Sequence, residues 1–124
     1  IKFKEQGSEQ ILVKGDPNRI RQVIDNLVSN AIRYTDKGEI NILLNNIDQK
    51  YLIEISDTGL GIPEEAIERI FERFYRTDKA RDRSKGGTGL GLSITKHIIE
   101  AHGSEIKVKS EEDKGSTFSF YLET

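Results

Sequence analysis

The chain has 124 residues, of which 35% are apolar and 32% charged, as expected for one domain with a modest core. It contains no cysteine and only two histidines, which excludes a disulfide framework, a thiolate metal site and a site built from several histidines. The apolar runs are far shorter than a membrane span, and the net charge of −2 predicts no nucleic-acid partner. Because it begins without methionine, we expect a piece of a longer protein.

The first regular elements are predicted by local signals. Short strands are expected over 2–5 and 10–14. Asp16 and Pro17 then form a strong helix start, with Asp16 as N-cap and Pro17 at the first helical position. Apolar residues at helical spacing mark the buried side of this helix: Ile20, Val23, Ile24, Leu27, Val28, Ala31 and Ile32.

A second face of this helix carries Asn26, Asn30 and Arg33 at i, i+4 and i+7. Asparagine is a poor helix former, so two of them inside one helix call for an explanation. One explanation is that a neutral amide oxygen can bind Mg²⁺ among phosphates without adding charge. The alternative is that both asparagines simply face solvent.

Two strands, 39–46 and 51–57, are predicted to pair as a hairpin. Asp57 shares the parity of Ile53 and Ile55, so its carboxylate points to the apolar side, where it needs a donor. One interpretation is a buried acceptor for an exocyclic amine such as that of adenine. The other is an Asp-Thr-Gly turn in which the side chain caps its own backbone.

The next helix is predicted to start with Pro63 at its first position and to run to Phe74. Residues 77–85 show no periodicity and contain a single apolar residue, so we expect a mobile loop. Residues 69–85 hold seven bases and three acids, a local charge of +4. A basic segment that leads into a glycine-rich stretch indicates a lid over polyphosphate, although 79–85 can also be read as a solvated loop.

Residues 86–92 read Gly-Gly-Thr-Gly-Leu-Gly-Leu, and a helical pattern follows at once. Glycines that open a helix expose backbone N–H groups at its positive end, a place to hold phosphate. The alternative is a flexible linker before the helix, which Gly103 would end. Strands over 105–109 and 116–122 complete the chain.

This order of elements favours an α+β sandwich, with one mixed or antiparallel sheet and helices on one face. It disfavours a βαβ dinucleotide fold. The glycine spacing is Gly-x-Gly-x-Gly, and it matches neither the dinucleotide fingerprint nor the P-loop.

Four segments, in this order and spacing, resemble the N, G1, F and G2 boxes of sensor histidine kinases. They are Asn26–Ala31, Asp57–Ile62, Phe71–Arg76 and Gly87–Leu92, and Gly115–Phe118 resembles the family's last glycine-containing segment. The resemblance covers nearly the whole chain, and the Phe-Glu-Arg-Phe-Tyr-Arg run is most similar to phosphate-response and cell-wall-regulating sensors. The family implies the Bergerat fold, a two-layer α/β sandwich whose mostly antiparallel sheet carries about three helices, shared with type II topoisomerases, the ninety-kilodalton heat-shock chaperone and mismatch-repair ATPases.

The resemblance also implies roles for particular residues. Asn30 would bind Mg²⁺, and Arg33 and Arg76 would stabilise the transferred phosphoryl group as catalytic residues. Asp57 would accept a hydrogen bond from the adenine amine, and a mobile ATP lid would span about 75–91. The implied ATP-binding set is Asn26, Asn30, Arg33, Tyr34, Asp57, Gly59, Gly61, Ile62, Tyr75, Arg76, Gly87, Thr88, Gly89, Leu90, Gly91, Leu92 and Thr117.

By the same resemblance, residues 1–124 are one ATP-binding catalytic domain of a membrane-anchored bacterial sensor, lying on the cytoplasmic side. Its cofactors would be ATP and Mg²⁺. Its partners would be a phosphoacceptor-histidine helical domain of the parent protein and a response regulator. The fragment would be monomeric and the parent homodimeric. His97 and His102 are expected to be structural or surface residues.

Hydrolysing relatives have a glutamate where this chain has Asn26, and an amide cannot take a proton from water. The residues therefore favour phosphoryl transfer over hydrolysis. The alternatives are an ATP-gated clamp of the chaperone or topoisomerase kind, a nucleotide-sensing module, and a serine kinase of the anti-sigma type.

Overall fold

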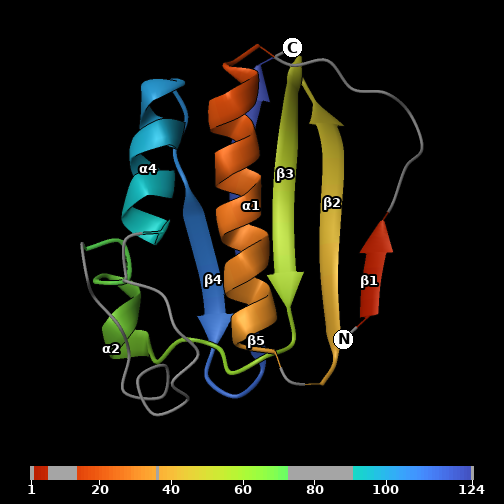
Figure 1. Cartoon of the computed structure of the whole chain (residues 1–124), viewed down its shortest axis with the longest axis vertical. Helices are drawn as coiled ribbons and strands as arrows, with labels where there is room; N and C mark the ends of the chain where they lie inside the picture. The colour runs from red at the N-terminus through yellow and green to blue at the C-terminus, as the bar shows by residue number, and fades with distance from the viewer. Residues whose placement is uncertain (1, 6–13, 36, 73–90, 124) are drawn as a thin grey trace.

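The computed structural model describes residues 2–5, 14–35, 37–72 and 91–123 (Figure 1). Its elements follow the predicted order, apart from the strand expected over 10–14, of which only Lys14 is described. They are β1 (Lys2–Glu5), α1 (Pro17–Arg33), β2 (Glu39–Ile47), β3 (Lys50–Asp57), α2 (Glu64–Ile67), α4 (Gly91–Ala101), β4 (Lys107–Glu111) and β5 (Gly115–Glu123).

The strands form one five-stranded sheet in the order β1-β2-β3-β5-β4. β1 runs parallel to β2, and every other neighbouring pair is antiparallel. The α+β sandwich with a mixed, mostly antiparallel sheet is therefore confirmed.

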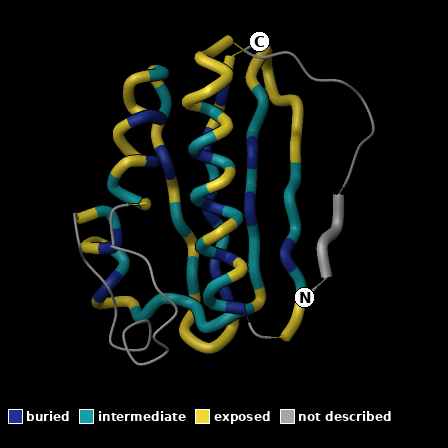
Figure 2. The backbone as a smooth tube through the Cα atoms, viewed as in Figure 1, coloured by how far each residue is buried: buried dark blue, intermediate teal, exposed yellow. Residues whose placement is uncertain are grey.

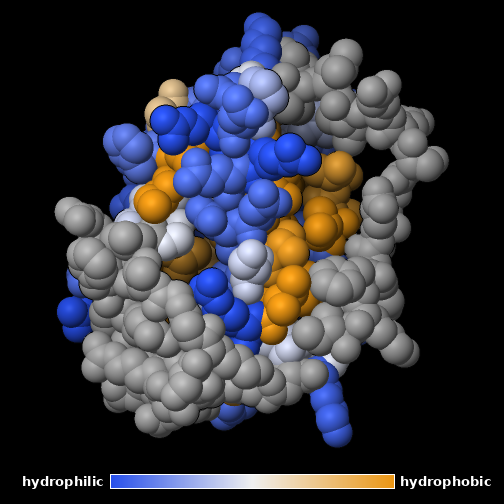
Figure 3. Space-filling view, viewed as in Figure 1, coloured by the Kyte–Doolittle hydropathy of each residue, from blue (hydrophilic) through white to orange (hydrophobic). Residues whose placement is uncertain are grey.

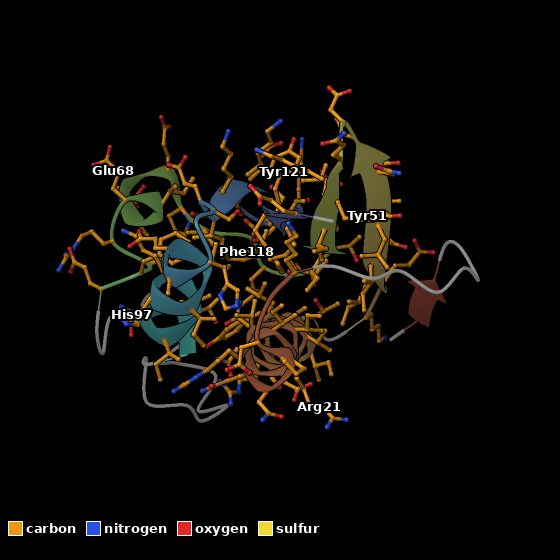
Figure 4. All side chains as sticks on the ribbon, turned by 90° about the horizontal axis from the view of Figure 1, so that it is seen from above. Arg21, Tyr51, Glu68, His97, Phe118 and Tyr121 are labelled. Carbon is orange, nitrogen blue, oxygen red and sulfur yellow. The ribbon has the colours of Figure 1, made fainter. Side chains whose placement is uncertain are left out.

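The helix layer depends on α1, whose start is capped as predicted. The Asp16 side chain accepts hydrogen bonds from the backbone N–H groups of Asn18 and Arg19. α1 and α4 lie side by side over one face of the sheet, and α2 lies beyond β4 (Figures 1 and 4). Figure 4 shows Arg21 on the outer side of α1, Phe118 between the helices and the sheet, and Tyr121 on the other side of the sheet.

The core lies between the helices and the sheet, as the buried segments of Figure 2 show. β5 contributes alternate residues to it, and the ring of Phe71 meets that of Phe118 edge to face with centroids 6.3 Å apart. The buried cluster comprises Val23, Leu27, Ile53, Ile55, Ala66, Ile70, Ile98, Ile99, Ile106, Phe118, Phe120 and Leu122.

Several element boundaries differ from the predictions, and those of α2 and β4 differ most. α2 ends at Ile67 instead of continuing toward Phe74, and Pro63 stands at its N-cap position, where it supplies no side-chain cap. The chain then continues in i→i+3 turns, with Arg69 donating to the Ala66 carbonyl and Glu72 to that of Arg69. β4 begins at Lys107, two residues later than expected.

The helices leave part of β2 uncovered. Ile32 of α1 and Leu44 of β2 are 42% and 41% exposed. Figure 3 shows apolar side chains at the surface beside α1, over β2 and β3. In the described part of the chain, no helix is long and apolar enough to cross a bilayer.

The end of the sheet away from Asp57 is polar. The β2–β3 hairpin closes there through Asp48 and Gln49, both with positive φ, as a tight right-twisted hairpin requires. A hollow of about 280 Å³ at this end is lined by Lys50, His102, Gly103, Ser104, Glu105, Lys107, Tyr121 and Glu123.

His102 joins the end of α4 to the start of α1. Its Nε2 accepts a hydrogen bond from the Asp16 N–H at 3.1 Å, and its Nδ1 lies 2.8 Å from the Ile98 carbonyl oxygen. A neutral ring with its proton on Nδ1 satisfies both partners, so we assign that tautomer. His97 is exposed, and the expectation that both histidines are structural or surface residues is confirmed.

His102→Ala should lower the free energy of unfolding by about 1–2 kcal/mol, because it removes the hydrogen bond that connects α4 to the start of α1 and the one that holds the ring on the Ile98 carbonyl. His97→Ala is the matched control and should change it by less than about 0.5 kcal/mol. Urea unfolding of both variants measures the difference, and equal effects would contradict the role assigned to His102.

Candidate functional site

Asp57 ends β3 on the helix-facing side of the sheet, as its parity predicts. One carboxylate oxygen accepts the Gly59 N–H at 2.9 Å, so the predicted self-capping turn is present. The side chain is also half-buried, and desolvation raises the pKa of its carboxyl above the ordinary value of 3.8, against hydrogen bonds from the backbones of Gly59 and Ser116. Asp57 therefore fits both sequence interpretations: it caps its own turn, and it is a partly desolvated acceptor.

The turn that follows Asp57 packs tightly against the end of α1. The Leu60 N–H donates to the Tyr34 carbonyl oxygen at 3.0 Å. A Cβ atom added at Gly59 would lie 2.1 Å from that same oxygen and 2.7 Å from Oγ1 of the buried Thr35. Only glycine allows this approach.

The same turn is held from the other side by the β4–β5 hairpin. The Asp113 N–H donates to the Leu60 carbonyl at 2.6 Å, and the Ile62 N–H donates to Ser110 Oγ at 2.7 Å. Gly61 has φ +69°, and an added Cβ would lie 2.0 Å from the Glu111 carbonyl oxygen. The turn is thus fixed between α1 and the hairpin.

Asn26 connects α1 to the first residue of α4. Its Nδ2 donates to the Gly91 carbonyl oxygen at 3.4 Å and to Thr95 Oγ1 at 3.3 Å. Thr95 is fully buried, so this amide does not simply face solvent. A carboxylate in its place could not donate to the Gly91 carbonyl.

The end of α1 carries Asn30 and Arg33, and Tyr34 follows as the C-cap residue; all three are half-buried. From Asn26 to Tyr34 the helix advances about 12 Å. Within that length α1 contacts both the start of α4 and the turn after Asp57. Segments far apart in the sequence therefore converge on the second half of α1.

Thr117 does not join this group. Its Oγ1 lies 3.0 Å from Ser56 Oγ, and both residues point to the side of the sheet away from the helices. Ser116 pairs with Asp57 across the strands, is buried, and shares its face. We therefore replace Thr117 by Ser116 in the candidate site, which alternation counted back from the buried Phe118 would have indicated.

The glycine-rich stretch enters the described structure only at its end. Gly91 is exposed, with nothing within 4 Å of an added Cβ, and Leu92 packs against the core, as does Ile62. The other predicted residues of the lid and glycine stretch lie outside the described residues. They are Tyr75, Arg76, Gly87, Thr88, Gly89 and Leu90.

Comparison with known proteins identifies the family of the chain. The family model for histidine kinase-, DNA gyrase B- and HSP90-like ATPases matches residues 15–124. The sensor histidine kinase WalK of Bacillus subtilis (strain 168) is 44% identical over 115 residues, which cover 90% of this chain and 19% of that protein. Sensor protein SrrB of Staphylococcus aureus (strain NCTC 8325 / PS 47) is 51% identical over 108 residues, which cover 86% of this chain and 18% of that protein. The chain therefore spans about a fifth of the length of these curated relatives.

Solved structures agree with the fold. The catalytic domain of histidine kinase ThkA, in a nucleotide-free form, superposes with a TM-score of 0.80 at 38% identity, covering 98% of this chain and 78% of that one. Full-length ShkA in complex with AMPPNP gives a TM-score of 0.84 at 30% identity, and the match covers 99% of this chain and 26% of ShkA.

Gly61→Ala should destabilise the protein more than Gly103→Ala, although the two glycines have similar φ angles of +69° and +74°. Both variants carry left-handed strain of about 1–2 kcal/mol. Gly61→Ala also collides with the Glu111 carbonyl, whereas nothing lies within 4 Å at Gly103. We expect a loss of about 3 kcal/mol or more for Gly61→Ala in urea unfolding, and equal losses would show that the turn is not held against the hairpin.

Asp57→Asn should leave the protein as stable as the wild type, or more stable, at pH 7. Burial raises the pKa of the folded carboxyl above 3.8, so the folded state holds its proton to higher pH than the unfolded chain. Ionisation therefore costs stability as the pH rises through this window, and the cost persists at neutral pH. The urea midpoints of the wild type and the variant should converge as the pH falls toward 4. A variant that is less stable than the wild type at pH 7 would contradict the upward shift of the Asp57 pKa.

Proposed function

Because the chain belongs to the histidine kinase-, DNA gyrase B- and HSP90-like ATPase family, we propose that it is the catalytic ATP-binding domain of a sensor histidine kinase. In this proposal it binds ATP with Mg²⁺ and presents the γ-phosphoryl group to a histidine on a separate helical domain of its parent protein. A response regulator then receives the phosphoryl group. The chain supplies nucleotide binding and orientation, and the parent supplies the acceptor.

One observation carries the proposal: the second half of α1 contacts both predicted nucleotide-binding segments. The Tyr34 carbonyl holds the turn after Asp57, and the Asn26 amide holds Gly91. A ligand that contacts both segments needs one group for the half-buried Asp57 carboxylate and another for the start of α4. A nucleotide has both, in its base and its phosphates.

At the base end, Asp57 offers a half-buried carboxylate whose pKa is raised by desolvation even though it accepts hydrogen bonds from the Gly59 and Ser116 backbones. An exocyclic amine such as that of adenine would add a further donor to this carboxylate. Ser116 lies directly across from Asp57 on the same face of the sheet. We therefore place the purine between the turn 57–62 and the end of α1.

At the phosphate end, we assign Asn30 to the metal and Arg33 to the phosphates. The described residues contain no cluster of three His, Cys, Asp or Glu side chains that could hold a metal by themselves. A metal here would therefore take most of its ligands from phosphate and water, which is how Mg²⁺ is usually bound, and the Asn30 amide oxygen suits it. When bound, Mg²⁺ would neutralise charge on the phosphate oxygens.

The amide at Asn26 favours transfer over hydrolysis. It has no basic atom at neutral pH that could activate water, and its donor group is already directed at the Gly91 carbonyl. Phosphoryl transfer requires positioning and charge stabilisation, which Arg33 and the predicted Arg76 would supply. The nucleophile in this scheme is an imidazole of the phosphoacceptor domain.

The wider context is part of the proposal. We infer a homodimeric, membrane-anchored bacterial sensor whose cytoplasmic side carries residues 1–124 as its catalytic domain, with residues of about 75–91 as the ATP lid. Support comes from the named sensor kinases, which are more than five times longer than the matched region.

Calorimetric titration of the 124-residue chain with a non-hydrolysable ATP analogue tests the proposal. We expect saturable binding that strengthens when Mg²⁺ is added. Asn30→Ala should weaken binding about tenfold with Mg²⁺ and much less without it, because the variant loses a metal ligand.

Equal weakening with and without Mg²⁺ would contradict the metal role of Asn30. No binding by the wild type at millimolar nucleotide would contradict the proposed function itself. Incubation with ATP and a separately produced phosphoacceptor domain should then yield acid-labile phosphohistidine, and an acid-stable product would indicate serine phosphorylation instead.

A further inference from the structure

Ser110 of β4 is the centre of a three-way hydrogen-bond network beside Asp57. Its Oγ accepts the Ile62 N–H at 2.7 Å, donates to the Gly115 carbonyl oxygen at 2.9 Å, and lies 2.8 Å from Ser116 Oγ. These contacts reach the turn after Asp57, the start of β5 and the buried Ser116.

The number of hydroxyl protons fixes which serine donates in the contact between Ser110 Oγ and Ser116 Oγ. A serine hydroxyl has one proton to donate and two lone pairs to accept with. The Ser110 hydroxyl donates its hydrogen bond to the Gly115 carbonyl, and one of its lone pairs accepts the Ile62 N–H. The arrangement that satisfies all three contacts therefore has Ser116 donating its own proton to Ser110.

This direction leaves Ser116 with lone pairs alone for any other partner. Asp57, its neighbour across the strands, also accepts hydrogen bonds through its carboxylate. Both side chains thus present acceptors on the same face of the sheet. Such a surface matches a donor such as an amine and repels a carbonyl oxygen at the same position.

We propose that Ser110 is a positioning residue that sets base specificity: by accepting the hydrogen bond of the Ser116 hydroxyl, it makes the site select a 6-amino purine over a 6-oxo purine. The proposal rests on nucleotide binding by this chain, and it adds a residue that lies outside every predicted nucleotide-binding segment. Ser110 acts through Ser116 and through the Ile62 backbone, without touching the base.

Competition titrations of the 124-residue chain with ATP and inosine triphosphate test this role, because their bases differ in the group at position 6 and, with it, in the proton on N1 of the 6-oxo base. Ser110→Ala should weaken ATP binding about three- to tenfold and change inosine triphosphate binding less than twofold, since the freed Ser116 hydroxyl can turn to donate. Ser110→Thr keeps the hydroxyl and should retain the wild-type ratio of the two affinities.

Ser104→Ala is the matched control for a lost hydroxyl. Ser104 Oγ also accepts a backbone N–H, that of Tyr121 at 3.2 Å, but it lies at the other end of the sheet. This variant should leave the affinity ratio unchanged. An equal loss of both affinities in Ser110→Ala would show that Ser110 is only structural and would overturn the proposal.

A double-mutant cycle tests whether Ser110 acts through Ser116. On a Ser116→Ala background, Ser110→Ala should no longer change the ratio of ATP to inosine triphosphate affinity. A ratio that still changes by the full amount would overturn the proposed route. A wild-type chain that binds neither nucleotide would instead refute the proposed function, so the two failures are distinguishable.

Discussion

The structure depends on a short turn that is held by backbone hydrogen bonds from two directions. The carbonyl of Tyr34 takes the Leu60 N–H on one side, and the Leu60 carbonyl takes the Asp113 N–H on the other. Gly59 and Gly61 are needed because a side chain at either would collide with a backbone oxygen. Since α1 also bonds to the start of α4, this one turn fixes the helix layer, the hairpin and the candidate site relative to one another.

The carboxyl of Asp57 lies beside this rigid turn, and its ionisation is energetically unfavourable. The carboxyl of Asp57 is held where ionisation is disfavoured, as the upward shift of its pKa shows. A carboxylate fixed in such surroundings needs little reorganisation when a donor arrives, because the protein dipoles around it are already in place. In the proposed function, burial of this carboxylate therefore lowers the stability of the chain and leaves an acceptor in place for the base, a pattern common where proteins bind ligands.

The sequence was sufficient where the physical signal is local. The capping pair before α1 and strand alternation placed α1 and the core-facing side of Asp57. The bond from Asn26 to Gly91 could not be foreseen, because it joins residues 65 positions apart whose approach depends on how two helices pack. The family motif points to Thr117, although strand alternation places this residue on the other face of the sheet. The short α2 shows that a proline and two acids are a weak helix signal when no side chain caps the start.

The left-handed pair Asp48 and Gln49 closes the hairpin at the opposite end of β3 from Asp57. The seven residue steps from one end of β3 to the other separate the two ends by about 23 Å. A dye or a tether to a solid support attached next to that bend would therefore leave free the end that carries the candidate site. The chain could be immobilised for surface-based titration or single-molecule fluorescence in a defined orientation, with the sheet itself as a spacer of known length.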